Sequence, residues 1–236
     1  MAMSRNQEDR KDAGMSATMI LDCPRRVILS KEHDFYERPE DYEARFYGTI
    51  GHAGFEMYGG EFEGVIQEQR YRRSLDVDGV EVEITGKSDW VDKERHLIID
   101  YKFIDSVTSK PVSVGLAKDG HESQVNVYRW LVAGGTNMVT GEVDHIDIEY
   151  GGIHYVTRGK KVDKNKPTAR KVAVNIWTLE ETEEFIRERL RPHVVYQQTK
   201  ELPPILTDEK GRRHYFCNYC PLREACDARE ELRNLE

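Results

Sequence analysis

The sequence has few cysteines, no long apolar run and no excess of positive charge, and each absence excludes a class of protein. Its 236 residues contain no apolar stretch near the ~20 residues of a membrane-spanning helix. The opening residues, MAMSRNQEDRKDAG, also lack the apolar segment of a secretory signal. We therefore expect a cytoplasmic protein with no membrane partner. Four cysteines in such a chain are more typical of a metal or redox site than of a disulfide framework.

The charge balance excludes an overall basic surface. The chain has 35 basic and 43 acidic residues, a net charge of −8, so any nucleic-acid site must be local. One locally basic loop, RGKKVDKNKPTARK at 158–171, contains a single acid beside Lys160, Lys161, Lys164 and Lys166. Such a run is as typical of a solvated loop as of a phosphate-binding one.

The order of predicted elements indicates one α/β domain with a mixed sheet. Apolar spacing predicts helices at 39–58, 120–135 and 178–199, the last opening on a capping box of Thr178 and Glu181. Strands are predicted at 64–75, 80–92 and 96–104, as an antiparallel meander, and at 145–157 and 169–179. We expect a disordered tail over 1–16 and a single domain over 17–236, with its core at about 39–200.

Two carboxylates and a lysine converge in the segment ITGKSDWVDKERHLIIDYKFI. Asp89 lies on the second strand of the meander, and Asp100 and Lys102 share one face of the third. Burying these charges together costs free energy unless a ligand offsets the desolvation. A divalent cation such as Mg²⁺ or Mn²⁺ would do so, because both ions prefer oxygen ligands. On its own, the D-x-K triplet is more typical of a surface salt bridge between Asp100 and Lys102.

With their flanks, GKSDW and LIIDYK resemble the active-site motif of the PD-(D/E)XK nucleases, most closely its RecB-like exonuclease branch. The resemblance implies that Asp89 and Asp100 are the two motif acids, that Lys102 is the motif lysine, and that the Tyr101 carbonyl also binds metal. A histidine from the preceding helix often joins the metal in this branch. His52, between glycines in GTIGHAGFE, matches that position.

A second part of the resemblance lies in ESQVNVYRWL. Gln124 and Tyr128 match the Q-x-x-x-Y motif of the same branch, which lies beside the substrate backbone, and i,i+4 spacing places both on one helix face. Tyr128 and Trp130 are also aromatic residues that would suit stacking of single-stranded bases.

The cysteines follow the pattern C-x₂-C-x₅-C at the C-terminal end, with one more near the N-terminus. By spacing alone, zinc and an iron–sulfur cluster both remain open. The arrangement resembles RecB-like nucleases that carry an iron–sulfur cluster, including AddB-type subunits and the fourth family of CRISPR-associated proteins. That resemblance implies a 4Fe-4S cluster on Cys23, Cys217, Cys220 and Cys226, joining segments at about 17–33 and 203–236.

The resulting hypothesis is a Mg²⁺- or Mn²⁺-dependent DNA exonuclease. The resemblance implies single-stranded DNA as substrate, a 5′ to 3′ direction, and a role in CRISPR spacer acquisition, recombination or repair, including phage-type relatives, with an integrase or helicase as partner. Two alternatives remain: a non-catalytic DNA-binding or assembly subunit that keeps the fold, and a zinc-stabilised nucleic-acid-binding protein in which the D-x-K is only a salt bridge.

Overall fold

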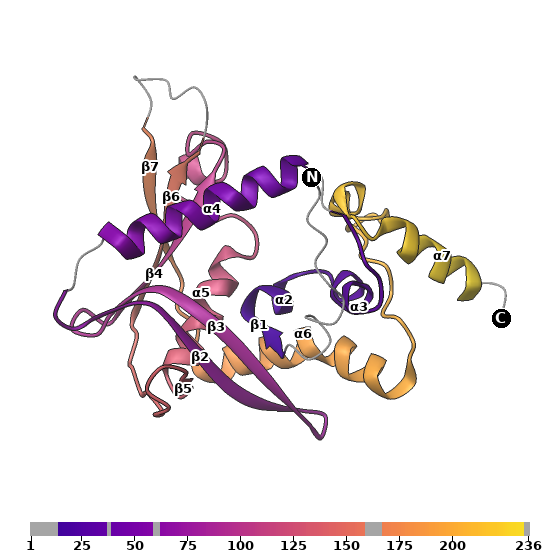
Figure 1. The fold of residues 1–236 in the computed structure, drawn as a ribbon, viewed down its shortest axis with the longest axis horizontal. Coiled ribbons are helices and arrows are strands. Elements are labelled where there is room, and N and C mark those ends of the chain that lie inside the picture. Colours follow the sequence, from indigo (N-terminus) through magenta and orange to yellow (C-terminus); the bar gives the residue numbers. More distant parts are fainter. Residues whose placement is uncertain (1–13, 37–38, 59–61, 159–166, 234–236) are drawn as a thin grey trace.

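The fold is built on one mixed β-sheet whose strands carry helices on both faces (Figure 1). A computed structural model describes residues 14–36, 39–58, 62–158 and 167–233. The strands are β1 (Met15–Ser16), β2 (Val65–Val77), β3 (Val80–Asp92), β4 (Leu97–Ile104), β5 (Thr136–Asn137), β6 (Tyr150–Thr157) and β7 (Ala169–Val174). The helices are α2 (Ala17–Leu21), α3 (Pro24–Glu32), α4 (Pro39–Tyr58), α5 (His121–Val132), α6 (Leu179–Thr199) and α7 (Arg223–Arg233), with 3₁₀ turns η1 (Val112–Val114) and η2 (Tyr215–Tyr219).

The predicted meander forms the centre of the sheet. The strand order is β5-β2-β3-β4-β6-β7, with β2, β3 and β4 antiparallel and β4 parallel to β6. Asp78 and Gly79 both adopt positive φ at the β2–β3 turn, as a tight two-residue hairpin requires. β1 adds to the edge of β3 at Ile84 and Thr85, where β4 does not pair. The prediction of an α/β fold with a mixed, helix-flanked sheet is confirmed.

Helices α4 and α5 contact β4 from opposite faces. Tyr101 and Phe103 pack against α4, so the alternating Asp100 and Lys102 face the side of α5. The apolar residues of α5 and α6 complete the core, including the fully buried Trp130, Leu131, Ile186 and Leu190. The capping box predicted at the start of α6 is present, and the helix runs on through Pro192.

The two ends of the described chain lie together. Figure 1 shows α3, near the N-terminus, beside α7, near the C-terminus, and the two helices are in contact. The buried Arg25 of α3 donates to the Pro203 carbonyl at 2.9 Å, to Glu230 at 2.8 Å and to the Cys226 carbonyl at 3.2 Å. Protein contacts alone therefore hold Cys23 near the C-terminal cysteine segment.

Several sequence predictions were wrong in detail. Met15 and Ser16 form β1 rather than ending a disordered tail, and residues 1–13 lie outside the described ranges. The strand predicted from 145 begins only at Tyr150, and the strand predicted to 179 ends at Val174. Helices α2, α3 and α7 were not predicted, because each is short or highly charged. None of the helices in the described ranges is long and apolar enough to span a bilayer.

Candidate active site

The candidate site lies where β3 and β4 separate. Moving away from the turn that joins them, the last paired residues are Trp90 and Ile99. The next residue on each strand is an aspartate, Asp89 on β3 and Asp100 on β4. In place of a ladder bond, the Asp89 carboxylate accepts the Tyr101 backbone N–H at 2.7 Å. The strands part at the motif acids, so both buried carboxylates reach one place: Asp89 is 8% exposed and Asp100 only 2%.

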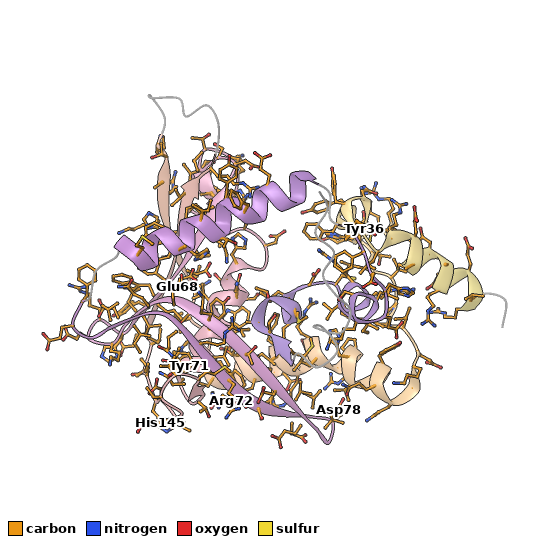
Figure 2. All side chains as sticks on the ribbon, viewed as in Figure 1. Tyr36, Glu68, Tyr71, Arg72, Asp78 and His145 are labelled. Carbon is orange, nitrogen blue, oxygen red and sulfur yellow. The ribbon has the colours of Figure 1, made fainter. Side chains whose placement is uncertain are left out.

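Three side chains form a group of potential metal ligands. His52 Nδ1 lies 3.2 Å from Glu68 Oε1 and 3.4 Å from Asp89 Oδ1. Ligand atoms of all three lie within 4.8 Å of one another. Figure 2 shows Glu68 on β2, close to α4, which supplies His52. Glu68 has a positive φ of 51°, an uncommon conformation for this residue, and its second carboxylate oxygen forms an ion pair with Lys87.

Asp100 and Lys102 form the second part of the site. Lys102 Nζ lies 2.8 Å from Asp100 Oδ2 and 3.1 Å from Oδ1. Burial raises the pKa of Asp100 to about 6, against the opposing effect of the Lys102 ammonium. The structure thus brings the predicted His52 and Asp89 together with Glu68, and places the predicted Asp100 and Lys102 beside them as an ion pair.

Close packing of α4 on β4 positions His52. A Cβ on Gly51 would lie 2.1 Å from the Phe103 ring, so only glycine lets that ring approach the helix. Phe55 stacks on Tyr101 with ring centroids 4.3 Å apart, and the His52 ring meets Phe103 edge-on at 5.7 Å. The glycine before His52 therefore makes room for the Phe103 ring of β4.

The predicted Gln124 and Tyr128 lie under the site on α5. Both are 7% exposed, and the Gln124 amide donates to the Tyr128 hydroxyl at 2.7 Å. A Cβ on Gly86, in the GKSDW motif, would lie 2.6 Å from Leu131 and 3.0 Å from Tyr128, so this glycine allows α5 to approach β3. Contact of Gln124 and Tyr128 with DNA stays a prediction. Trp130 is fully buried, so its suggested role in stacking bases is wrong.

The donor set fits a hard divalent cation. Carboxylate oxygens and one imidazole nitrogen are ligands that Mg²⁺ and Mn²⁺ accept. Asp100 Oδ2 and Glu68 Oε2 are buried and accept no hydrogen bond, although each has an ammonium within ion-pair distance. A carboxylate oxygen has two lone pairs, so each of these oxygens can bind a divalent cation in addition to its lysine. His52, Glu68, Asp89 and Asp100 would therefore hold the metal. The Tyr101 carbonyl stays a predicted ligand.

Metal binding should depend steeply on pH. Hydrogen bonds to Asp89 and Glu68 raise the pKa of His52 to about 9, so His52 carries a proton at neutral pH that a metal must displace. Below pH 9 the cation competes with that proton, so affinity increases as pH rises. We expect the apparent Kd for Mn²⁺ to fall about tenfold from pH 7 to pH 8, with about one proton released per ion.

Calorimetric titration in two buffers of different ionisation enthalpy measures this proton release. His52→Gln should bind Mn²⁺ more weakly and with less proton release. Binding that is independent of pH in the wild type would contradict the assignment of His52 as a ligand.

The predicted phosphate-binding loop lies outside the described residues. Lys160, Lys161, Lys164 and Lys166 all fall within 159–166, so their contact with DNA stays a prediction. Arg158, just before that segment, donates to Asp105 at 2.9 Å.

The four cysteines line one small pocket, but they do not form a closed metal site in the structure. Cys23, Cys217, Cys220 and Cys226 share its lining with Arg26, Arg213 and Arg223, among others. All four are free thiols within the described residues, yet no three of their sulfur atoms lie within 4.8 Å of one another there. A tetrahedral zinc site would place its sulfurs about 3.8 Å apart, given a Zn–S distance of about 2.3 Å. The structure therefore does not show the predicted four-cysteine cluster, although all four residues line the same pocket.

Comparisons with known proteins give the fold and the family of the chain. The crystal structure of SSO0001 superposes with a TM-score of 0.57 at 18% identity, covering 94% of this chain and 92% of that one. A phage-related exonuclease from Haemophilus somnus 129PT matches with a TM-score of 0.45 at 14% identity, covering 78% and 83%. No curated protein sequence matches significantly. The model of the PD-(D/E)XK nuclease superfamily matches residues 28–227 and so includes every residue of the candidate site. The chain belongs to the PD-(D/E)XK nuclease superfamily.

Proposed function

We propose that this nuclease is a Mg²⁺- or Mn²⁺-dependent DNA exonuclease that degrades single strands, in the 5′ to 3′ direction, in recombination, repair or CRISPR spacer acquisition. The observation that carries the proposal is the convergence of His52, Glu68 and Asp89 beside the buried Asp100–Lys102 pair. A non-catalytic family member would have no need to keep two buried carboxylates at the end of diverging strands, where burial raises the pKa of Asp100.

The chain's own residues would divide the reaction between them. His52, Glu68, Asp89 and Asp100 would hold the cation, which supplies Lewis-acid stabilisation of the phosphodiester and acidifies a water molecule. The Lys102 ammonium is oriented by Asp100 and would position the attacking water or stabilise the charge that develops on the phosphate. Asp89 fixes the Tyr101 backbone by accepting its N–H, which keeps the backbone of β4 in place beside the site.

We also propose that the four cysteines carry a 4Fe-4S cluster, with zinc as the alternative. What supports this is the single small pocket that all four cysteines line. Arg213 and Arg223 favour thiolate at Cys217, and Arg26 does so at Cys220, although burial raises the pKa of both thiols in the metal-free protein. Such guanidinium groups would offset the negative charge of a thiolate-bound cluster.

End-labelled DNA tests the proposed activity. Purified protein with Mn²⁺ should shorten a single strand progressively, and should do so faster than it shortens the matching duplex. Comparison of 5′- and 3′-labelled strands should show release of the 5′ label as mononucleotide or short product at the earliest times. Single- and double-stranded DNA that both stay intact, with Mn²⁺ or Mg²⁺, would refute the proposal. Visible absorption and elemental analysis of anaerobically purified protein distinguish iron–sulfur from zinc.

A further inference from the structure

The segment around the C-terminal cysteines is basic and aromatic in a chain that is acidic overall. Residues 210–223, KGRRHYFCNYCPLR, contain four arginines and lysines and no acid, whereas the whole chain has a net charge of −8. Tyr215, Phe216 and Tyr219 are 59%, 55% and 60% exposed, and the η2 turn that carries them has no buried residue. These aromatic side chains therefore do not serve the core. Large exposed rings gathered in one place mark an interaction surface.

Three rings of this segment, those of His214, Tyr215 and Phe216, form a continuous group. The centroids of Tyr215 and Phe216 lie 4.2 Å apart, and His214 lies 4.7 Å from each of them. The Phe216 backbone N–H donates to His214 Nδ1 at 3.4 Å, which helps to fix the turn. Adjacent flat π surfaces that stay exposed to solvent suit a ligand that is itself a series of flat rings.

The cations around these rings keep positive charge. Arg213 and Arg223 both pair with the single carboxylate of Asp227, the latter at 3.6 Å, so two guanidinium groups share one acid. Arg212 pairs with Asp208 at 2.7 Å while its side chain stays 72% exposed. Guanidinium groups held in this way retain N–H donors for phosphate oxygens. Aromatic rings interleaved with such groups are the combination that binds single-stranded nucleic acid.

Helix α4 connects this segment with the candidate active site. Glu32, at the end of α3, pairs with Arg229 of α7 at 2.9 Å. Tyr36, labelled in Figure 2, follows four residues later and is 72% exposed. α4 then presents the exposed Phe46 and Tyr47 before it reaches His52. At about 1.5 Å per residue, about 20 Å of helix separates Pro39 from His52. A DNA strand that follows α4 would thus pass from the C-terminal segment to the candidate active site.

We infer that Tyr215, Phe216 and Tyr219, with His214, form a base-stacking platform that holds single-stranded DNA on its way to the active site, while Arg212, Arg213 and Arg223 contact its phosphates. This inference rests on the proposed function and adds to it the residues that would select a single strand. Bases in a duplex are already stacked on one another and cannot lie on these rings, whereas every unpaired base can, whatever its identity.

Binding to an intact and an abasic strand tests the platform. In buffer without divalent cations, fluorescence anisotropy gives the Kd of the full chain for a dT20 oligonucleotide and for an abasic strand of the same length. We expect Tyr215→Ala and Phe216→Ala each to weaken dT20 binding about tenfold, since one base stacked on an aromatic side chain contributes about 1–3 kcal/mol. Neither variant should change the affinity for the abasic strand, which has phosphates but no bases.

Two variants serve as controls. Tyr215→Phe keeps the ring and should bind dT20 within about twofold of wild type. Tyr150→Ala removes a ring that is 61% exposed at the start of β6, away from the C-terminal segment, and should have no effect. Equal affinity of wild type for dT20 and the abasic strand would overturn the inference. So would alanine variants that lose affinity for both strands alike, or for neither.

This outcome is separable from that of the proposed function. A protein that cleaves DNA but does not distinguish dT20 from the abasic strand would refute the platform alone. A protein that shows the expected binding pattern but cuts no DNA with Mn²⁺ would refute the nuclease proposal alone. A platform that instead receives a protein partner would leave dT20 binding unchanged in every variant, which also overturns the inference.

Discussion

Asp100→Asn should abolish nuclease activity without destabilising the protein. The substitution keeps the size of the side chain but removes a carboxylate charge from the metal site and the partner that orients Lys102. A metal ion contributes several kcal/mol of transition-state stabilisation, which corresponds to a loss of about 10³-fold or more at about 1.4 kcal/mol per tenfold. Initial rates on end-labelled single-stranded DNA at saturating Mn²⁺ measure it.

The expected stability follows from the pKa of Asp100. Burial raises this pKa to about 6 despite the Lys102 ammonium, so near neutral pH the charged form is disfavoured by folding. As pH falls through 6, Asp100 becomes protonated, its burial cost disappears and the free energy of unfolding increases. An uncharged amide avoids the penalty, and Lys102, with its side chain 21% exposed, can reach solvent. The thermal midpoint of Asp100→Asn should therefore equal or exceed that of wild type at pH 7.5.

A matched control lies just beyond the end of the same strand. Asp105 pairs with Arg158, but its side chain is 89% exposed, and such surface pairs contribute little to stability. Asp105→Asn should keep both activity and thermal midpoint. An Asp100→Asn protein that retains a tenth of wild-type activity would show that Asp100 does not hold the catalytic metal.

The position of Glu68 opposite Asp89 could have been predicted from the sequence. Asp78 and Gly79 mark a two-residue turn, and Glu68 lies as many residues before Asp78 as Asp89 lies after Gly79. Antiparallel pairing therefore places the two acids opposite each other. The predicted meander already contains both strands, but no motif singles out Glu68, so only the register of the hairpin would have identified it. Its positive φ could not have been predicted, because glutamate rarely adopts a left-handed conformation and nothing in its neighbours indicates one.

Other features of the site depend on packing between distant segments. Periodicity gave the limits of α4 correctly, yet it could not show that Phe103 packs against Gly51 and so sets the position of His52. In the same way, cysteine spacing identified candidate ligands without giving their separation. The position of Cys23 depends on Arg25, which reaches the backbone of the C-terminal segment, and on Arg189, which donates to the carbonyls of Ile20 and Asp22. Hydrogen bonds between residues this far apart in the chain produce no local sequence pattern, so they could not have been predicted.

Cys23→Ser should cost the metal-loaded protein about 5 kcal/mol of unfolding free energy. With the metal bound, Cys23 and the C-terminal cysteines close a loop of about 200 residues, and by analogy with disulfides such closure removes about 5 kcal/mol of chain entropy from the unfolded state. Serine keeps the size of the side chain and cannot replace the thiolate. Urea denaturation under anaerobic conditions, followed by circular dichroism, measures the change, and elemental analysis reports the metal lost.

The metal-free protein provides the decisive comparison, because it separates the metal from the contacts that surround it. Arg25 is 2% exposed and holds the two ends together without any cofactor, so chelated wild type should still fold, at reduced stability. In that state Cys23 has no metal to bind, and chelated wild type and chelated Cys23→Ser should unfold at the same urea concentration. A serine variant that loses equal stability with and without metal would mean that the thiol matters through packing alone. The cysteine pocket would then have no metal-binding role in stability.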